Sequence, residues 1–280
     1  MGLAVPNSIT DLEAIAAKLR GEIVAYSSKT KTPHLGSCLS CVDILTVAYF
    51  DVLNLDPENP RHPDRDRFIL SKGHAAPALF QVLAERGYFP RQLLWDSDHA
   101  AGGLFGEHPP APDHLAGIEA ATGSLGHGLP MGVGMALAGK LRGKSYRVVA
   151  LLSDGECNEG SIWEAAMLAA AQALDNITVV VDFNKWQATG RSREVMALDP
   201  LAEKWRAFGW DTVEIDGHDI GALRDSLRTD HAGTGCPNAI IAHTVKGKGV
   251  SFMEDDNNWH YRIPSPDEVA AAKLGLGLSL

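Results

Sequence analysis

Continuous apolar runs alternate with amphipathic segments along most of the chain. The runs at residues 148–152, 177–181 and 239–242 are typical of strands buried on both faces of a parallel sheet. Shorter runs at 67–70 and 211–215 predict two further strands. Because helical patterns separate these runs, the sequence predicts an α/β fold with five or six parallel strands and helices on both faces.

Apolar residues recur at helical spacing in the segments between the predicted strands. The predicted helices cover residues 8–26, 41–53, 75–86, 131–141, 161–174, 200–208, 220–228 and 266–273. Thr10 and Glu13 could form a capping box in the first of them. Residues 29–37, 54–66, 95–112 and 185–198 predict loops, and the long 95–112 segment, which contains His99, could be a lid. No internal repeat or linker interrupts the pattern, so residues 1–280 are expected to form a single domain.

The segment from Val148 to Asn184 predicts a strand, a helix and a second strand. Asp154 follows the first strand and Asn184 follows the second, 30 residues later, which is about one crossover unit. The carboxyl ends of parallel strands meet at one edge of the sheet, so these two side chains can approach each other. Their oxygens suit Mg²⁺ or Ca²⁺. An Asp-Gly pair after a strand is also an ordinary turn, and taken alone that interpretation is the simpler one.

Composition and charge narrow the classes of function. The chain has 280 residues, 45% of them hydrophobic and 21% charged, and a net charge of −10. This balance is that of a soluble protein and argues against a nucleic-acid or anionic-membrane surface, although a local basic pocket remains compatible with it. No apolar run approaches the roughly 20 residues of a membrane span, and no signal-peptide pattern is present, which predicts a cytoplasmic protein.

Four cysteines are too few and too scattered for a disulfide scaffold. Cys38 and Cys41 have redox spacing, and His34 is near in sequence, so a thiol switch or a zinc pair is conceivable. No second cysteine pair completes a zinc site, and the apolar residues around these two favour the start of a buried helix.

Histidines concentrate in the irregular segments that adjoin the predicted strand ends. They are His34, His74, His108, His127 and His260, and Lys246 lies in a Gly-rich turn of the same kind. Because core histidines would be scattered through helices and strands as well, this distribution favours a polyanion site with a hard metal. Histidines near neutral pH are also suited to acid–base work. The glycines at 123, 126 and 128 do not match the dinucleotide fingerprint, since no apolar strand precedes them.

These motifs, in this order, resemble the amino-terminal, diphosphate-binding half of transketolase. The resemblance covers nearly the whole chain, through the motifs HLGS at 34–37, SKGH at 71–74, HP at 108–109, TGSLG at 122–126, the 148–184 unit, KGKG at 246–249 and WH at 259–260. It implies thiamine diphosphate and Mg²⁺ or Ca²⁺ as cofactors. Thiamine diphosphate supplies a carbanion, so the protein must position it, neutralise the diphosphate and move protons.

The resemblance also implies a role for each matching residue. The implied metal ligands are Asp154, Asn184 and the backbone carbonyl of Trp186. The implied cofactor-binding residues are His74, Gly123, Ser124, Leu125, Asp154, Gly155, Asn184, Lys246 and His260. The implied sugar-facing residues are His34, Ser37, His108 and His260. The implied catalytic histidines are His34, His74, His108 and His260. The implied interface acids, which would link paired cofactors, are Glu159 and Glu164.

Two departures accompany the resemblance. Ser153 stands where the family has glycine, and Phe183 stands where the family commonly has a second Asn or a similar polar residue. Metal binding is expected to survive both. In the family a glutamate from the following pyrimidine-binding domain activates the cofactor, and that domain and the C-terminal domain are not found in these 280 residues. A partner chain carrying them is therefore expected, in an assembly of two copies of each chain.

The implied function is that of the N-terminal subunit of a split transketolase, which moves a two-carbon ketol unit from a ketose phosphate to an aldose phosphate. The ordinary transketolase reaction is the favoured hypothesis. A variant for an unusual sugar, such as apulose phosphate or a sulfonated sugar, is the close alternative. Deoxyxylulose phosphate synthase and dehydrogenase first components share the fold, but the His-rich motifs favour transketolase. A non-catalytic regulatory homologue is the alternative from another class, and the presence of Asp154, Asn184, His74 and His260 argues against it.

Overall fold

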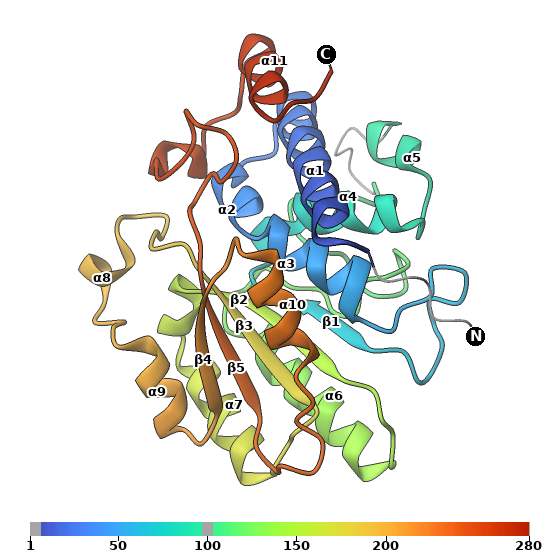
Figure 1. The fold of residues 1–280 in the computed structure, drawn as a ribbon, viewed down its shortest axis with the longest axis vertical. Helices are drawn as coiled ribbons and strands as arrows, with labels where there is room; N and C mark the ends of the chain where they lie inside the picture. The colour runs from blue at the N-terminus through green and yellow to red at the C-terminus, as the bar shows by residue number, and fades with distance from the viewer. Residues whose placement is uncertain (1–6, 97–102, 280) are drawn as a thin grey trace.

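A sheet of five parallel strands forms the centre of the molecule, as a computed structural model that describes residues 7–96 and 103–279 shows (Figure 1). The strand order is β1-β2-β3-β5-β4, and every neighbouring pair is parallel. The strands are β1 (Arg67–Leu70), β2 (Val148–Ser153), β3 (Ile177–Phe183), β4 (Asp211–Asp216) and β5 (Asn238–His243). All five strands predicted from the apolar runs are confirmed.

Helices cover both faces of the sheet, also as predicted (Figure 1). The helices whose side chains share a core with one face are α1 (Ile9–Thr30), α2 (Leu35–Ser40), α3 (Val42–Val47), α4 (Ala76–Arg86) and α10 (Ile220–Arg228). Those on the other face are α6 (Gly128–Leu141), α7 (Gly160–Ala171) and α9 (Leu201–Ala207). Alternate strand residues supply the two cores: Val149 and Leu151 face the first, whereas Ala150 and Leu152 face the second. This explains why the strands read as continuous apolar runs.

Smaller elements complete the chain around these layers. They are α5 (Arg91–Asp96), α8 (Ser192–Val195), α11 (Pro266–Gly275), a π-helical turn η1 (Ala48–Val52), and the 3₁₀ turns η2 (Gly73–Ala75), η3 (Gly155–Asn158) and η4 (Asn257–His260). Of the predicted lid at 95–112, residues 97–102, including His99, lie outside the described residues.

The first helix and the segment after it differ from the prediction. Ser8 rather than Thr10 caps α1, because the Ser8 side chain accepts from the Asp11 N–H while the Asp11 carboxylate accepts from the Ser8 N–H. The predicted loop at 29–37 is shorter in the structure. It is bounded by Lys31 at the end of α1 and His34 at the start of α2, both with positive φ. Ser37 therefore lies on a helix, not in a loop.

The predicted helix at 41–53 divides into α3 and the π-helical turn η1. The wider turn places Tyr49 against Phe68 of β1, with ring centroids 5.0 Å apart. Cys38 and Cys41 are free and buried, and burial raises the pKa of both thiols to about 12. This environment agrees with the predicted buried helix and leaves neither thiol reactive.

The register of the sheet places the ends of four strands together. Leu70 pairs with Leu151, Ser153 pairs with Asp182, and Phe183 pairs with His243. The residues that follow β1, β2, β3 and β5 consequently emerge at one edge, as open parallel folds require. No helix in the described part of the chain is both long and apolar enough to cross a membrane.

Candidate active site

A polar cavity of roughly 410 Å³ lies at the carboxyl edge of the sheet and brings together most of the predicted site residues. The predicted residues that line it are His34, Ser37, His74, His108, Gly123, Leu125, Gly155, Glu159, Asn184, Trp186 and His260. Further lining residues, for which no role was predicted, are Ser153, Asn158, Gln187, Ala188 and Thr189. Segments as distant in sequence as α2 and η4 therefore meet at one site.

Three histidines form a cluster on one wall of the cavity. The ring centroids of His34 and His260 are 4.7 Å apart, those of His34 and His74 are 5.4 Å apart, and those of His74 and His260 are 6.1 Å apart. The backbone N–H of His34 donates to the carbonyl of His260 at 2.6 Å, which joins the start of α2 to η4. His34 holds a φ of 67°, a conformation that non-glycine residues adopt rarely and that recurs at functional sites.

Burial keeps these imidazoles neutral. Burial and the nearby His108 lower the pKa of His34 to about 4, and burial and the Lys246 ammonium lower the pKa of His260 to about 3. Burial, and to a smaller extent the positive charge of Lys72, lowers the pKa of His74 well below its ordinary value. A neutral imidazole can accept a proton from a hydroxyl. The Nδ1 atom of His34 is buried and has no hydrogen-bond partner among the described residues.

Lys246 lies beneath the histidine cluster. Its Nζ contacts Oδ1 of Asn257 at 2.7 Å and Nδ1 of His260 at 3.0 Å. Gly36 permits this close packing, because a Cβ at that position would stand 2.9 Å from the Lys246 side chain. Burial, followed by the charge of Lys72, lowers the pKa of Lys246 to about 8. No carboxylate among the described residues forms an ion pair with this buried cation, which an anionic ligand would therefore stabilise.

Asp154 lies directly under the cavity at the end of β2. Its carboxylate accepts hydrogen bonds from the N–H of Gly155 at 2.9 Å, the N–H of Lys185 at 2.8 Å and the Ser192 hydroxyl at 2.7 Å. Burial raises the pKa of Asp154 to about 6, and the negative charge of Asp182 adds to the rise. A divalent cation would therefore stabilise the ionised form of this buried carboxylate.

The donor set at this edge fits a hard cation that keeps open positions. Asp154 supplies a carboxylate, Asn184 an amide oxygen and Trp186 a backbone carbonyl, which are oxygen ligands of the kind that Mg²⁺ and Ca²⁺ prefer. No group of three or more His, Cys, Asp or Glu side chains among the described residues could hold a metal. Three protein oxygens would leave further positions of such a cation open to oxygens of a ligand such as a diphosphate.

Glycines and an orphaned amide make room for that ligand. A Cβ at Gly155 would stand 3.0 Å from the Gln187 side chain, and one at Gly123, where φ is 147°, would stand 2.8 Å from the His108 ring. Both glycines line the cavity, so the backbone can approach a ligand closely. The Nε2 atom of Gln187 is buried without a partner beside them. These features fit a bound diphosphate cofactor.

Several predicted residues lie outside the cavity lining. Ser124 and His127 are not among its lining residues, and His127, which is exposed, does not join the other histidines. Glu164 is exposed on α7, and Glu159, at the cavity rim, is exposed as well. Exposure of both acids is compatible with the interface role that the resemblance implies.

Three buried charged groups at this edge had no predicted role. Lys72 and Asp182 form an ion pair with no exposed surface. The Glu156 carboxylate accepts from the Ser71 hydroxyl at 2.5 Å and from the Gly126 N–H at 2.9 Å. Burial raises the pKa of Glu156. At Asp182 burial also acts to raise the pKa, but Lys72 together with hydrogen bonds from the Ser40 and Thr244 hydroxyls lowers it. A charged residue within an apolar strand was the signal that could have identified Asp182.

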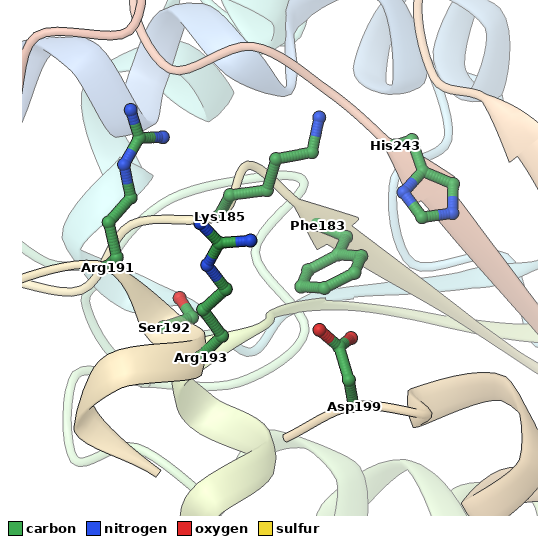
Figure 2. Close-up of a pocket in the computed structure, with 7 residues that line it drawn as sticks. All are labelled: Phe183, Lys185, Arg191, Ser192, Arg193, Asp199 and His243. Atoms are coloured by element: carbon green, nitrogen blue, oxygen red, sulfur yellow. The ribbon is translucent and has the colours of Figure 1, made fainter. Parts of the chain in front are cut away.

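A second cavity, of roughly 490 Å³, lies beyond the segment that follows β3 (Figure 2). Phe183 and Lys185 line it, whereas Asn184 and Trp186 line the histidine cavity, so successive side chains face different cavities. Phe183 packs beside His243, with ring centroids 5.2 Å apart. The Phe183 departure from the family pattern is therefore located away from the histidine cavity. At the other departure, the Ser153 hydroxyl accepts from the Glu156 N–H at 3.2 Å, so the serine fits the turn.

The fold and the site define a parallel α/β protein with a histidine-lined cavity at the carboxyl edge of its sheet, the position where such folds bind phosphorylated ligands. Residues 13–279 match the family model of the transketolase thiamine diphosphate binding domain. The chain belongs to this family, and the resemblance read from its motifs is confirmed.

Relatives and solved structures agree with this assignment. The chain is 42% identical over 266 residues to one subunit of the apulose-4-phosphate transketolase of Actinobacillus succinogenes, covering 95% of each protein. It is 40% identical over 244 residues to one subunit of the 6-deoxy-6-sulfo-D-fructose transketolase of a Clostridium species, covering 87% of this chain and 88% of that protein. The crystal structure of Campylobacter jejuni transketolase superposes with a TM-score of 0.90 at 26% identity. That match covers 97% of this chain but only 43% of the solved transketolase.

Proposed function

We propose that the chain is the diphosphate-binding subunit of a two-chain transketolase, which transfers a two-carbon ketol unit from a ketose phosphate to an aldose phosphate. The observation that carries the proposal is the convergence of the histidine cluster with Gly155, Asn184 and Trp186 on one cavity. Family membership supports the same activity.

In the proposed site, Asp154, Asn184 and the carbonyl of Trp186 would hold Mg²⁺ or Ca²⁺, which would help to bind the diphosphate of thiamine diphosphate. The Gly155 N–H, which donates to Asp154 in this structure, would turn to the diphosphate, and His74 and Lys246 would place hydrogen-bonding or positive groups beside it. Gly123, Ser124 and Leu125 accommodate the rest of the cofactor. When bound, the cofactor supplies the nucleophilic carbon and stabilises the two-carbon fragment.

The histidines of this chain would move the protons that the transfer requires. Breaking a carbon–carbon bond beside a hydroxyl needs a base to remove the hydroxyl proton. His34 would be suited to this, because the residue lines the cavity and its imidazole is neutral. His260 is hydrogen-bonded to the Lys246 ammonium, whose positive charge helps to keep the imidazole neutral. Ser37 and His108 bind further hydroxyls of the sugar from the same cavity.

The relatives support a branched pentulose phosphate as a candidate substrate alongside the ordinary ketose phosphates. Two of them, at 39% and 42% identity, are named as subunits of apulose-4-phosphate transketolases. A third acts, by its name, on a sulfonated fructose. Assay of the assembled enzyme with xylulose 5-phosphate, apulose 4-phosphate and 6-deoxy-6-sulfofructose, compared by kcat/KM, distinguishes these substrates.

The partner in this proposal is a C-terminal subunit that carries the pyrimidine-binding domain and its activating glutamate, in an assembly of two copies of each chain. Two relatives that match this chain over 93% and 95% of their own length are named as single subunits of their enzymes, which supports a two-chain organisation. The purified chain with cofactor and Mg²⁺ should show no ketol transfer until the partner is added. Full activity of this chain alone would refute the partner requirement.

Calorimetry of thiamine diphosphate binding to the complex, in the presence of Mg²⁺, tests the cofactor site. Asp154→Ala should reduce the affinity by at least about 10-fold, because it removes the only carboxylate of the ligand set. Asp225→Ala is the matched control, since Asp225 lies on α10, away from the carboxyl edge. Equal affinity of Asp154→Ala and the wild type would exclude the proposed metal ligand.

A further inference from the structure

Asp182 connects four segments at the carboxyl edge of the sheet. It occupies β3 and is fully buried. Its carboxylate accepts from Lys72 after β1, from the Ser40 hydroxyl of α2 at 2.6 Å, and from the Thr244 hydroxyl after β5. The fourth contact is with the amide nitrogen of Asn184, at 3.4 Å. One carboxylate therefore joins β1, α2, β5 and the end of β3 beside the proposed cation site.

Lys72 extends this network toward the sugar-facing wall. Its Nζ is fully buried and donates to the Ser37 carbonyl at 2.9 Å as well as to Asp182. Replacing a buried ion pair with apolar residues of similar volume is often neutral or stabilising, so stability alone does not account for such a pair. A role in positioning neighbouring groups explains why the pair of Lys72 and Asp182 lies under the cavity.

The chemistry of a carboxylate determines how the Asn184 amide is oriented. An ionised carboxylate only accepts hydrogen bonds, so the side of the amide that faces Asp182 must be its NH₂ group. The same NH₂ group lies 3.5 Å from the Ser40 hydroxyl. The amide oxygen is thereby turned to the opposite side, where it accepts from the Trp186 N–H at 3.1 Å. Trp186, whose backbone carbonyl is another proposed metal ligand, lies on that side.

We propose that Lys72 and Asp182 are a positioning pair, which orients the amide of Asn184 so that its oxygen, and not its nitrogen, faces the divalent cation. The inference rests on the proposed function of Asn184 as a metal ligand. Lys72 keeps the Asp182 carboxylate in place by balancing its charge, and the carboxylate in turn excludes the flipped amide. Neither residue lines the cavity, so both act through Asn184.

Two double variants distinguish the effect of Asn184 amide orientation on Mg²⁺ binding from the effect of losing the two charges. Lys72→Met with Asp182→Asn removes both charges but keeps an oxygen that can accept from Asn184. Lys72→Met with Asp182→Leu removes the acceptor as well. The measurement is the apparent Kd for Mg²⁺, by calorimetry on the complex with the partner chain at saturating thiamine diphosphate. We expect the Leu variant to bind Mg²⁺ about 10- to 100-fold more weakly, as for other residues that orient metal ligands, and the Asn variant to stay near wild type.

The matched control is Arg65→Met with Glu119→Leu. This pair is also largely buried, with an N–O distance of 2.7 Å, but its Arg65 directly precedes β1, at the amino end of that strand and away from the carboxyl edge. It should leave the Kd for Mg²⁺ unchanged. Thermal melts check that each variant folds, and Asp182→Val replaces Asp182→Leu if the larger side chain prevents folding, because β-branched residues suit strands.

The outcomes separate this inference from the proposed function. Wild-type affinity for Mg²⁺ in a folded variant without the acceptor overturns the positioning role. Equal weakening in the Asn and Leu variants also overturns it, because the loss would then follow charge and not amide orientation. Failure of the wild type itself to bind Mg²⁺ and thiamine diphosphate would instead refute the proposed function.

Discussion

The histidine cluster illustrates how burial sets chemistry at the scale of single residues. His34, His74 and His260 share a wall of the cavity, and burial is the largest cause of the lowered pKa of each. The imidazoles are consequently neutral at physiological pH and can act as bases. The same burial destabilises the folded chain at acidic pH, because burial opposes protonation of these rings in the folded chain and not in the unfolded chain.

The free energy of unfolding of the cofactor-free chain should fall as the pH drops from about 6.5 toward about 4. The folded pKa values of His34 and His260, about 4 and about 3, lie below the ordinary value of 6.5, so the unfolded chain binds protons first. Each histidine contributes a slope of up to about 1.4 kcal/mol per pH unit in this window. Urea unfolding at several pH values measures it.

A variant with His34→Asn and His260→Asn should have a shallower slope below about pH 6.5. Above that pH the stabilities of the two proteins should depend on pH in the same way, because both histidines are then neutral in the folded and unfolded chains. Parallel slopes throughout the acid range would contradict the assignment of neutral buried histidines.

At the scale of elements, local capping decides where α1 begins. The sequence offers two Ser/Thr–acid pairs, at 8 and 11 and at 10 and 13, and the structure uses the first in a reciprocal pair of hydrogen bonds. The earlier cap extends the helix, which packs its apolar stripe into the core with Leu12 and Ala16. The reciprocal hydrogen bonds of Ser8 and Asp11 thus start the helix two residues before a cap at Thr10 would.

Ser8→Ala should lower the free energy of unfolding by about 1 kcal/mol, because it leaves the Asp11 N–H without its acceptor. Thr10→Ala, in the exposed first turn of the same helix, should change it by less than about 0.5 kcal/mol. Chemical denaturation of the two variants provides the comparison. A larger loss from Thr10→Ala would mean that the helix starts at the later cap.

At the scale of the whole molecule, two exposed acids lie at and near the cavity rim, where the proposed partner would complete the site. They are Glu159, at the rim, and Glu164, on α7. The family resemblance places acids at these positions between subunits. A reversal of charge there should therefore weaken assembly more than the same change elsewhere on the surface.

Glu164→Arg should weaken association with the partner chain by about 10-fold or more, since an interfacial acid would meet groups arranged for a negative charge. Glu58→Arg is the control, because Glu58 is exposed in the connection that precedes β1, at the opposite edge of the sheet. Sedimentation velocity of mixed subunits measures both. Equal association of the Glu164→Arg and Glu58→Arg proteins would remove Glu164 from the interface.

The fold was largely determined by local sequence patterns. Apolar runs specify strands buried on both faces, and all five strands and the main helices follow from them. The motifs also identified most of the residues that line the histidine cavity, and Asp154 and Asn184 directly follow strand ends. These features depend on periodicity and residue type, which are properties of short segments.

Only the tertiary structure decided how distant segments combine. His127 resembles the other histidines in sequence but is exposed and apart from them, since burial depends on neighbours that the local segment does not contain. The network of Asp182 with Lys72, Ser40 and Thr244 joins residues from four segments, so no motif could reveal it. The sequence determined which groups are present at the carboxyl edge, whereas the packing of the sheet and helices determined their partners, pKa values and orientation.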